Sequence, residues 1–424
     1  VVVIPPRDGR QVYLEIDTKG LEPGAWTVSI LCRALDRDAA DTTLTVPLTV
    51  WNHRLPEHQT IGLCHWGYEH SSYLKDQPEA ALEDQLRHGT SVFVSTFAPR
   101  ATFDEKGELA GEPDYAEVDA YMDARRGRGI ILFCGYQGAL SGPAPARSET
   151  WNRAHVAWLR AWVEHMKSRG FTYEEWALYP VDEPGLHPGL VELFIDMARL
   201  AREADPNIRI YTDPVGDASL EDLRAMAPYV DIWCPNRTGI VLKPDSTKLE
   251  FIKSTGSDVF VYECLGNAKH RSALAYYRGQ AWLCAHHGFK AMGFWTYCTT
   301  RFDPWFNNGE PDYLLVYQGR GVVPSKRWHA VRDGIEDHGM LTRLREAMEK
   351  AGEDPARADV VARARDLLTR RVAEVARFCG LEDDGDTPEV GGTRRQRAVE
   401  DRRWQTLREI RRDIATLLDA LAVP

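Results

Sequence analysis

Two acidic residues stand side by side where a run of bulky apolar residues ends. In the stretch WALYPVDEPG, residues 176–185, Asp182 and Glu183 follow an apolar run that predicts a buried strand, and Pro184 comes directly behind them. Neighbouring carboxyl groups disfavour each other's ionisation, so one of the two keeps its proton to a higher pH. We therefore expect Glu183 to act as a general acid near neutral pH while Asp182 remains anionic.

The proline bears on whether both acids can face one cleft. On a regular strand, Asp182 and Glu183 would point to opposite faces. Pro184 removes a hydrogen-bond donor and is expected to hold Glu183 in an extended conformation as the chain leaves the sheet, where strict alternation lapses. We predict that both carboxyl groups open into the same cleft. The alternative is that they only cap the next helix, although that helix is predicted to begin some residues later, near His187.

Further polar and aromatic residues stand at the ends of other apolar runs. Aromatic rings cover the apolar C–H face of a sugar ring, while carboxylates and amides bind its hydroxyl groups. The mixture therefore predicts a carbohydrate site, and because no Cys/His metal-ligand spacing occurs, we expect neither a metal ion nor another cofactor. The candidate substrate-binding residues are His65, Trp66, Tyr136, Asp213, Asn236, Glu263, Trp295 and Tyr297.

Short apolar runs alternate with amphipathic stretches through the middle of the chain. Near-continuous apolar strands that alternate with helices indicate a parallel sheet covered on both faces. Eight such units predict a closed (β/α)8 barrel, in which chemistry gathers at the carboxyl ends of the strands. An open doubly wound sheet is the main competitor, but no glycine-rich loop follows the first run. The eight runs are residues 60–69, 90–99, 129–138, 176–184, 208–216, 230–237, 258–266 and 291–299.

The two ends of the chain have different patterns. Residues 1–58 alternate apolar and polar side chains over 10–17, 25–34 and 43–52, which predicts the end of an N-terminal β-sandwich domain whose beginning lies upstream. Residues 59–345 form the predicted barrel. Residues 346–424 predict a C-terminal α-helical extension, which packs beside the barrel or joins a partner subunit in a homo-oligomer.

Composition excludes some classes of partner. The 424 residues include 52 Lys and Arg against 63 Asp and Glu, a net charge of −11, which disfavours nucleic acid or an anionic membrane as the main partner. No apolar run approaches the roughly 18 residues of a membrane helix, and the first residues lack the pattern of a signal peptide. Secreted, periplasmic and cytoplasmic locations all remain open. The eight cysteines contain no CxxC pair and are expected to be buried free thiols.

Several separated motifs resemble glycoside hydrolase family 123 and its bacterial relatives. PGAWTVSILCRALDRDAADTTLTVPLTVWNHRLP, residues 23–56, is similar to the close of that family's N-terminal β-sandwich, and YPVDEPG, residues 179–185, resembles its Asp-Glu catalytic pair. GFWTYCTTRFDPW, residues 293–305, and GRGVVPSKRWHAVRDGIEDHGML, residues 319–341, resemble the loop after the eighth strand and the segment that follows. The resemblance covers most of residues 20–345.

The resemblance implies substrate-assisted, retaining hydrolysis of β-linked N-acetylgalactosamine. In that scheme Glu183 protonates the leaving oxygen and later activates water, while Asp182 orients the substrate's own 2-acetamido group for attack on C1.

Two alternatives stay open. Glu183 as acid/base and Glu263 as nucleophile would make a retaining glycosidase with a covalent glycosyl-enzyme, which needs no acetamido group. A barrel alone does not imply activity, so a non-catalytic carbohydrate-binding protein is the second alternative.

Overall fold

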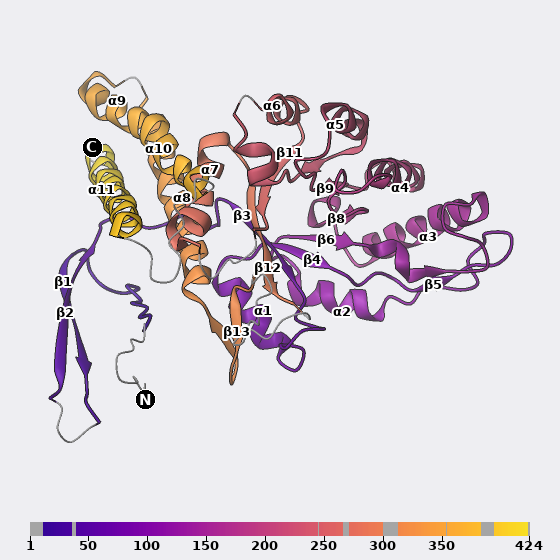
Figure 1. The fold of residues 1–424 in the computed structure, drawn as a ribbon, viewed down its shortest axis with the longest axis horizontal. Helices are drawn as coiled ribbons and strands as arrows, with labels where there is room; N and C mark the ends of the chain where they lie inside the picture. The colour runs from indigo at the N-terminus through magenta and orange to yellow at the C-terminus, as the bar shows by residue number, and fades with distance from the viewer. Residues whose placement is uncertain are drawn as a thin grey trace.

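The chain is described here by a computed structural model. It covers residues 12–35, 40–244, 246–265, 271–299, 313–352, 354–382 and 394–422. Figure 1 shows a sheet surrounded by helices, with a two-stranded hairpin on one side and the C-terminal helices packed next to the last helix of the barrel.

Eight parallel strands close into a barrel. Their order is β8-β6-β4-β3-β12-β11-β10-β9, and a parallel bridge between Leu178 and Ile210 joins the two outermost strands of that order. Each of the eight predicted apolar runs contains one of these strands, so the prediction of a (β/α)8 barrel is confirmed. The strands are β3 Gly62–Gly67, β4 Val92–Ser95, β6 Ile130–Cys134, β8 Trp176–Tyr179, β9 Tyr211–Thr212, β10 Ile232–Trp233, β11 Asp258–Glu263 and β12 Ala291–Cys298.

One helix follows each of these strands and covers the outside of the sheet. In α3, Val156, Leu159, Val163 and Met166 recur at helical spacing and are all buried, as the sequence predicts. Short strand pairs, β5 Ala101–Thr102 with β7 Leu140–Ser141 and β13 Val316–Gln318 with β14 Val322–Pro324, lie in the longer connections. The helices are α1 Pro78–Arg87, α2 Ala116–Arg125, α3 Glu149–Ser168, α4 Leu190–Ala204, α5 Leu220–Met226, α6 Thr247–Ser254, α7 Gly279–His287 and α8 Lys326–Ala351.

Alternate residues of each strand fill the inside of the barrel. On β8, Ala177 and Tyr179 join the interior cluster, whereas Trp176 and Leu178 pack outward with the helices. On β11, Tyr262 points inward by the same period of two. The last inward residues of the strands therefore form the floor beneath the barrel's carboxyl-end mouth.

The N-terminal segment forms a single antiparallel hairpin. β1 Gly24–Cys32 pairs with β2 Thr42–Val50, as the alternation in these two runs predicts. The strand expected over residues 10–17 is wrong for the described part, since residues 12–17 form none. Within the described residues no third strand pairs with this hairpin, and its side chains Trp26 and Leu44 are exposed.

The C-terminal helices pack on the barrel through apolar side chains and one buried charge cluster. α9 Ala358–Asp366, α10 Val372–Ala376 and α11 Arg394–Ala422 follow α8, which runs without a break through residue 345. Asp337 of α8 is fully buried and accepts bonds of 2.7 and 2.9 Å from the Arg278 guanidinium and one of 3.0 Å from the Trp282 ring nitrogen. Arg411 of α11 reaches the same carboxylate at 3.3 Å.

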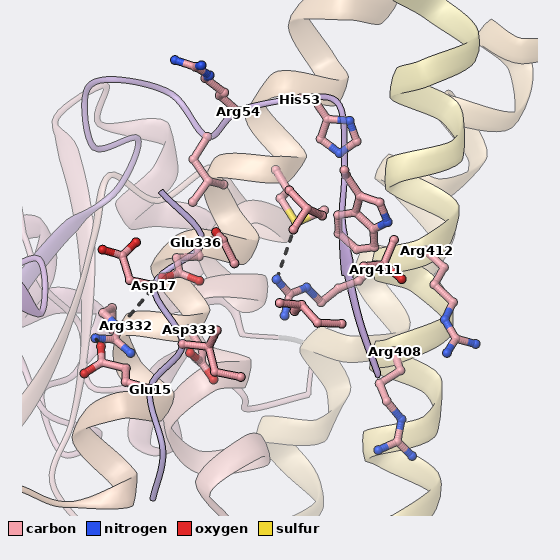
Figure 2. A pocket seen from close by; sticks show the side chains of 18 of the residues that line it. Glu15, Asp17, His53, Arg54, Arg332, Asp333, Glu336, Arg408, Arg411 and Arg412 are labelled. Carbon is pink, nitrogen blue, oxygen red and sulfur yellow. Dashed lines mark hydrogen bonds and ion pairs between the residues drawn. The ribbon is translucent and has the colours of Figure 1, made fainter. Parts of the chain in front are cut away.

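A cavity of about 1010 Å³ lies between the N-terminal segment, the end of β2, α8 and α11. In Figure 2, Arg411 extends from α11 toward this space, and Arg332 of α8 pairs with Glu15 of the N-terminal segment. None of the predicted site residues lines it. Within the described ranges, no helix has both the length and the apolarity needed to cross a membrane.

Asp337→Ala is expected to destabilise the protein by about 3–5 kcal/mol, because it removes the carboxylate that binds the buried Arg278 guanidinium twice and leaves that guanidinium only its bond of 3.2 Å to Asp333. The free energy of unfolding in urea measures this. Asp366→Ala is the matched control, since it removes an exposed pair with Arg370 on the surface of α9 and should leave the unfolding midpoint unchanged. Equal midpoints for both variants would contradict the role given to Asp337.

Candidate active site

The turn after β8 presents the acidic pair at the mouth of the barrel. Asp182 is exposed and Glu183 is half-buried, so neither side chain is turned fully into the protein body. The expectation that Glu183 is extended is wrong: its φ is +47°, in the left-handed region. Its backbone N–H donates to Asp213 Oδ1 at 3.1 Å, and this bond to the loop after β9 helps to override the local preference of a residue before proline.

Glu183 is set up to hold a proton. Burial raises the pKa of its carboxyl, the hydrogen bond from the Tyr262 hydroxyl to Oε1 opposes that shift, and the negative charges of Asp182 and Glu263 raise it further. The net direction is upward from the ordinary value. A carboxyl group with a raised pKa keeps its proton closer to neutral pH, as a general acid requires.

Asp182 is fixed from below by a tyrosine of the barrel floor. The Tyr179 hydroxyl donates to Asp182 Oδ1 at 2.5 Å, and the same hydroxyl contacts Asp213 Oδ2. Asp213 is 1% exposed. Burial, followed by the charge of Asp182, raises the pKa of the Asp213 carboxyl well above its usual value. The structure thus brings Asp182, Glu183 and Asp213 together.

Glu263, by contrast, forms a buried ion pair with Arg237. Its Oε2 accepts bonds from Arg237 Nε at 3.1 Å and from the Thr238 backbone and hydroxyl at 3.1 and 2.5 Å. Its Oε1 accepts a bond of 2.8 Å from the Cys264 backbone N–H. Both oxygens of this carboxylate, itself 1% exposed, are therefore engaged by the protein.

Aromatic rings line the mouth near Glu183. Trp295 is half-buried, donates its ring N–H to the Tyr68 hydroxyl at 3.3 Å and stands edge-on to Tyr313, with 4.7 Å between ring centroids. Trp66 lies inside the barrel with its ring centroid 5.5 Å from that of Tyr262. These rings come from β3, β11, β12 and the segment after β12. Residues 300–305 of the motif GFWTYCTTRFDPW lie outside the described residues.

His65 and Tyr297 do not reach this mouth. Both lie between the barrel and the helices, where the Tyr297 hydroxyl donates to Asp84 of α1 at 2.9 Å and His65 Nε2 lies 2.9 Å from the Thr90 hydroxyl. Burial lowers the pKa of His65 to about 3. Trp295 and Tyr297 are two positions apart and would share a face of a regular strand, but the pairing of β12 with β3 shifts between Phe294 and Cys298, and the two rings lie on opposite sides of the sheet.

Tyr136 and Asn236 also have structural surroundings. Tyr136 is buried against His155 and Trp158 of α3. Asn236 follows β10, and its side-chain oxygen accepts a bond of 2.7 Å from the Gly239 backbone N–H at the start of a helical turn.

Sequence reasoning missed the tyrosines that hold the pair. Tyr179 and Tyr262 are strand residues rather than loop residues, so a search of segment ends passes over them. The period of two along each strand could have found them. Tyr179 comes two positions after the inward-facing Ala177 and ends β8, and Tyr262 comes two positions after the inward-facing Phe260 and is next to the end of β11. Among the described residues, no cluster of three or more His, Cys, Asp or Glu side chains could hold a metal ion.

The chain is a (β/α)8 barrel with an acidic pair at its carboxyl-end mouth. Enzymes of this fold class carry their chemistry on the strand-to-helix loops. Among solved structures, the chain is similar to a family 123 glycoside hydrolase from Clostridium perfringens, described for glycolipid glycan hydrolysis, with a TM-score of 0.61 and 15% identity over 82% of this chain and 69% of that one. The expected resemblance to family 123 is therefore confirmed in the fold.

Other solved structures are less similar. An endo-β-1,4-mannanase from Thermotoga petrophila has a TM-score of 0.46 and 13% identity over 67% of this chain and 78% of its own. A family 39 glycoside hydrolase from Bacteroides cellulosilyticus has a TM-score of 0.44 and 14% identity over 74% of this chain and 71% of its own. No family model matches the chain, and no curated protein is similar to it in sequence.

Gly185→Ala is expected to destabilise the protein by about 1–3 kcal/mol more than Gly170→Ala. Both glycines have positive φ, but a Cβ on Gly185 would lie 2.6 Å from the Ala218 Cβ and 2.7 Å from its backbone nitrogen, whereas a Cβ on Gly170 meets nothing within 4 Å. Urea unfolding of the two variants gives the comparison. Equal losses would show that the turn carrying the acidic pair is not held against the loop after β9.

Proposed function

We propose that the chain is a retaining glycoside hydrolase that removes terminal β-linked N-acetylgalactosamine, or a related N-acetylhexosamine, by substrate-assisted catalysis. The observation that carries the proposal is the adjacent pair at the barrel mouth, in which Glu183 has a raised pKa and Asp182 is exposed and anchored by Tyr179. The two acids share one turn but have different partners, which is what two different roles require.

In the proposed reaction, Glu183 gives its proton to the glycosidic oxygen as the bond to C1 breaks. The oxygen of the substrate's 2-acetamido group attacks C1 from the opposite face, and Asp182 accepts a hydrogen bond from the acetamido N–H as positive charge develops there. The Glu183 carboxylate then takes a proton from water, which opens the bicyclic intermediate. Two inversions at C1 leave the anomeric configuration unchanged.

The surroundings of Glu263 favour this scheme over a covalent glycosyl-enzyme. A nucleophilic carboxylate needs an oxygen free to attack C1. Glu263 has both oxygens hydrogen-bonded, one of them to a buried Arg237 that is itself held by the Tyr276 carbonyl at 2.7 Å and by Gln280 at 2.8 Å. We assign Glu263 a structural part at the rim.

We propose that Trp295, with Tyr313 beside it, covers the apolar face of the sugar. The Trp295 ring is half-buried and stands edge-on to Tyr313, whose pKa is raised by burial and then by the neighbouring Cys264 and Glu183. An aromatic wall next to the proton donor suits a pyranose stacked on one side and hydrogen-bonded on the other.

A substrate panel tests the proposal. Aryl β-N-acetylgalactosaminide, β-N-acetylglucosaminide, β-galactoside and β-glucoside are compared, and we expect release only from the acetamido sugars and competitive inhibition by an N-acetyl thiazoline analogue. Cleavage of the plain glycosides without thiazoline inhibition, with a fluorosugar that labels Glu263, would support the covalent alternative instead. Binding without release from any sugar would favour a carbohydrate-binding protein.

Glu183→Gln should lower kcat by about 10²–10⁴-fold on poor leaving groups, because the general acid is lost. Asp182→Asn should also lower kcat strongly, because the developing charge on the acetamido nitrogen loses its acceptor. Steady-state kinetics on folded variants measure both. Glu192→Gln, the same change on the exposed side of α4, is the control and should match the wild type.

Tyr262→Phe should move the alkaline limb of the kcat/KM profile to higher pH. The hydroxyl of Tyr262 stabilises the ionised form of Glu183 and so lowers its pKa; without it, the pKa rises and the acid stays protonated over a wider range. Tyr211→Phe removes another hydroxyl from the barrel interior and is the control, with an unmoved limb expected. A limb that stays in place in Tyr262→Phe would mean that it reports another group.

A further inference from the structure

Asp213 lies beneath the acidic pair, where it contacts Glu183 directly and Asp182 through the Tyr179 hydroxyl. It follows β9, which neighbours β8 in the barrel, and its side chain is 1% exposed. Its Oδ1 accepts the backbone N–H of Glu183 at 3.1 Å, and its Oδ2 lies in hydrogen-bond contact with the hydroxyl of Tyr179. The proposed reaction gives Asp213 no role of its own.

The hydrogen bonds around Tyr179 do not balance unless an extra proton is present. A phenol hydroxyl carries one hydrogen, yet that of Tyr179 is within hydrogen-bond distance of two carboxyl oxygens, on Asp182 and on Asp213. Burial raises the pKa of Tyr179 well above its usual value, so the phenol keeps this hydrogen. The second contact is then a hydrogen bond only if one of the two carboxyl groups is protonated.

Burial decides which carboxyl group holds that proton. Asp182 is exposed, whereas an ionised Asp213 would be a buried charge. No Lys, Arg or His in the described part of the chain pairs with Asp213. The titratable groups that face it are all neutral or acidic: Tyr179, Asp182 and Glu183 around β8, Tyr211 of β9, Tyr262 of β11, and the thiols of Cys64, Cys134 and Cys234.

We infer that Asp213 is a neutral carboxylic acid which donates its proton to Tyr179 and thereby positions both Asp182 and Glu183. Every polar atom then has a partner: Asp213 donates through Oδ2 to the Tyr179 oxygen, Tyr179 donates to Asp182, and Asp213 Oδ1 accepts from the Glu183 backbone. Asp213 is a positioning residue. Its effect on catalysis rests on the proposed function, whereas its protonation does not.

A neutral Asp213 fixes the direction in which the Tyr179 hydroxyl donates its hydrogen. An ionised Asp213 would compete for the single hydrogen and release Asp182 from its anchor. A neutral Asp213 can only donate toward Tyr179, so the hydrogen of Tyr179 is directed to Asp182 Oδ1. It also keeps a further negative charge away from the pair, whose proton transfer depends on the charges around Glu183.

The protonation is tested by the pH dependence of unfolding, without any substrate. Asp213 binds a proton when folded and loses it when unfolded above about pH 4, so wild-type stability should fall with rising pH relative to Asp213→Asn, a neutral isostere. The ratio of unfolding constants, wild type over Asp213→Asn, should rise with pH from about pH 5 upward, approaching about tenfold per pH unit, until the pH reaches the raised pKa of the folded Asp213 carboxyl. Asp217→Asn, an exposed position on the same loop, should give a flat ratio.

A flat ratio for Asp213→Asn would overturn the inference, whatever the protein's activity. The second arm uses the substrate found by the panel: Asp213→Asn should keep kcat/KM at least about tenfold above Asp213→Ala, because the amide can donate to Tyr179 and accept from Glu183. Equal loss in both variants would show that a charged Asp213 is needed and would also overturn it. If the wild type releases no sugar, the proposed function fails while the unfolding measurement still decides the state of Asp213.

Discussion

The carboxyl groups of the acidic pair and of Asp213 are held by tyrosine hydroxyls and backbone N–H groups, and the described chain brings no basic side chain to them. A tyrosine hydroxyl supplies a hydrogen bond but no positive charge, so burial continues to favour the protonated acid. Glu263, at the end of β11, has the opposite kind of partner, because the guanidinium of Arg237 holds its carboxylate in an ion pair. The two environments act in opposite ways: burial without a basic partner favours the protonated acid at Glu183 and Asp213, whereas Arg237 compensates the charge of Glu263.

This arrangement depends on which strands are neighbours. The bridge between β8 and β9 brings Tyr179 and Asp213 together, and closure of the barrel brings Tyr262 of β11 across to Glu183. The left-handed backbone conformation of Glu183 is the third requirement. It lets the side chain reach Tyr262 of the barrel floor while the backbone N–H donates to Asp213. Local sequence preference alone would not produce that turn.

The sequence was sufficient for the barrel and for the position of the acidic pair. Eight apolar runs that alternate with helical segments locate the strands, since a sheet buried on both faces demands continuous apolar residues. Side-chain direction at the strand ends was much harder to predict. His65 and Tyr297 stand near strand ends yet face the helices, because direction there depends on register, and the shift in β12 has no mark in the sequence. Tyr179 and Tyr262 were missed for the complementary reason, as they lie within strands.

The buried contact between Asp337 and Arg411 bears on how the chain divides into parts. The last helix of the barrel, α8, is also the first helix of the C-terminal bundle, and its one buried carboxylate binds guanidinium groups from both sides. A cut near residue 345 would therefore run through the middle of a shared helix and strip one counter-ion from a site that both halves helped to bury. The barrel and the C-terminal helices therefore share this buried charge, and neither part alone would keep all of its members.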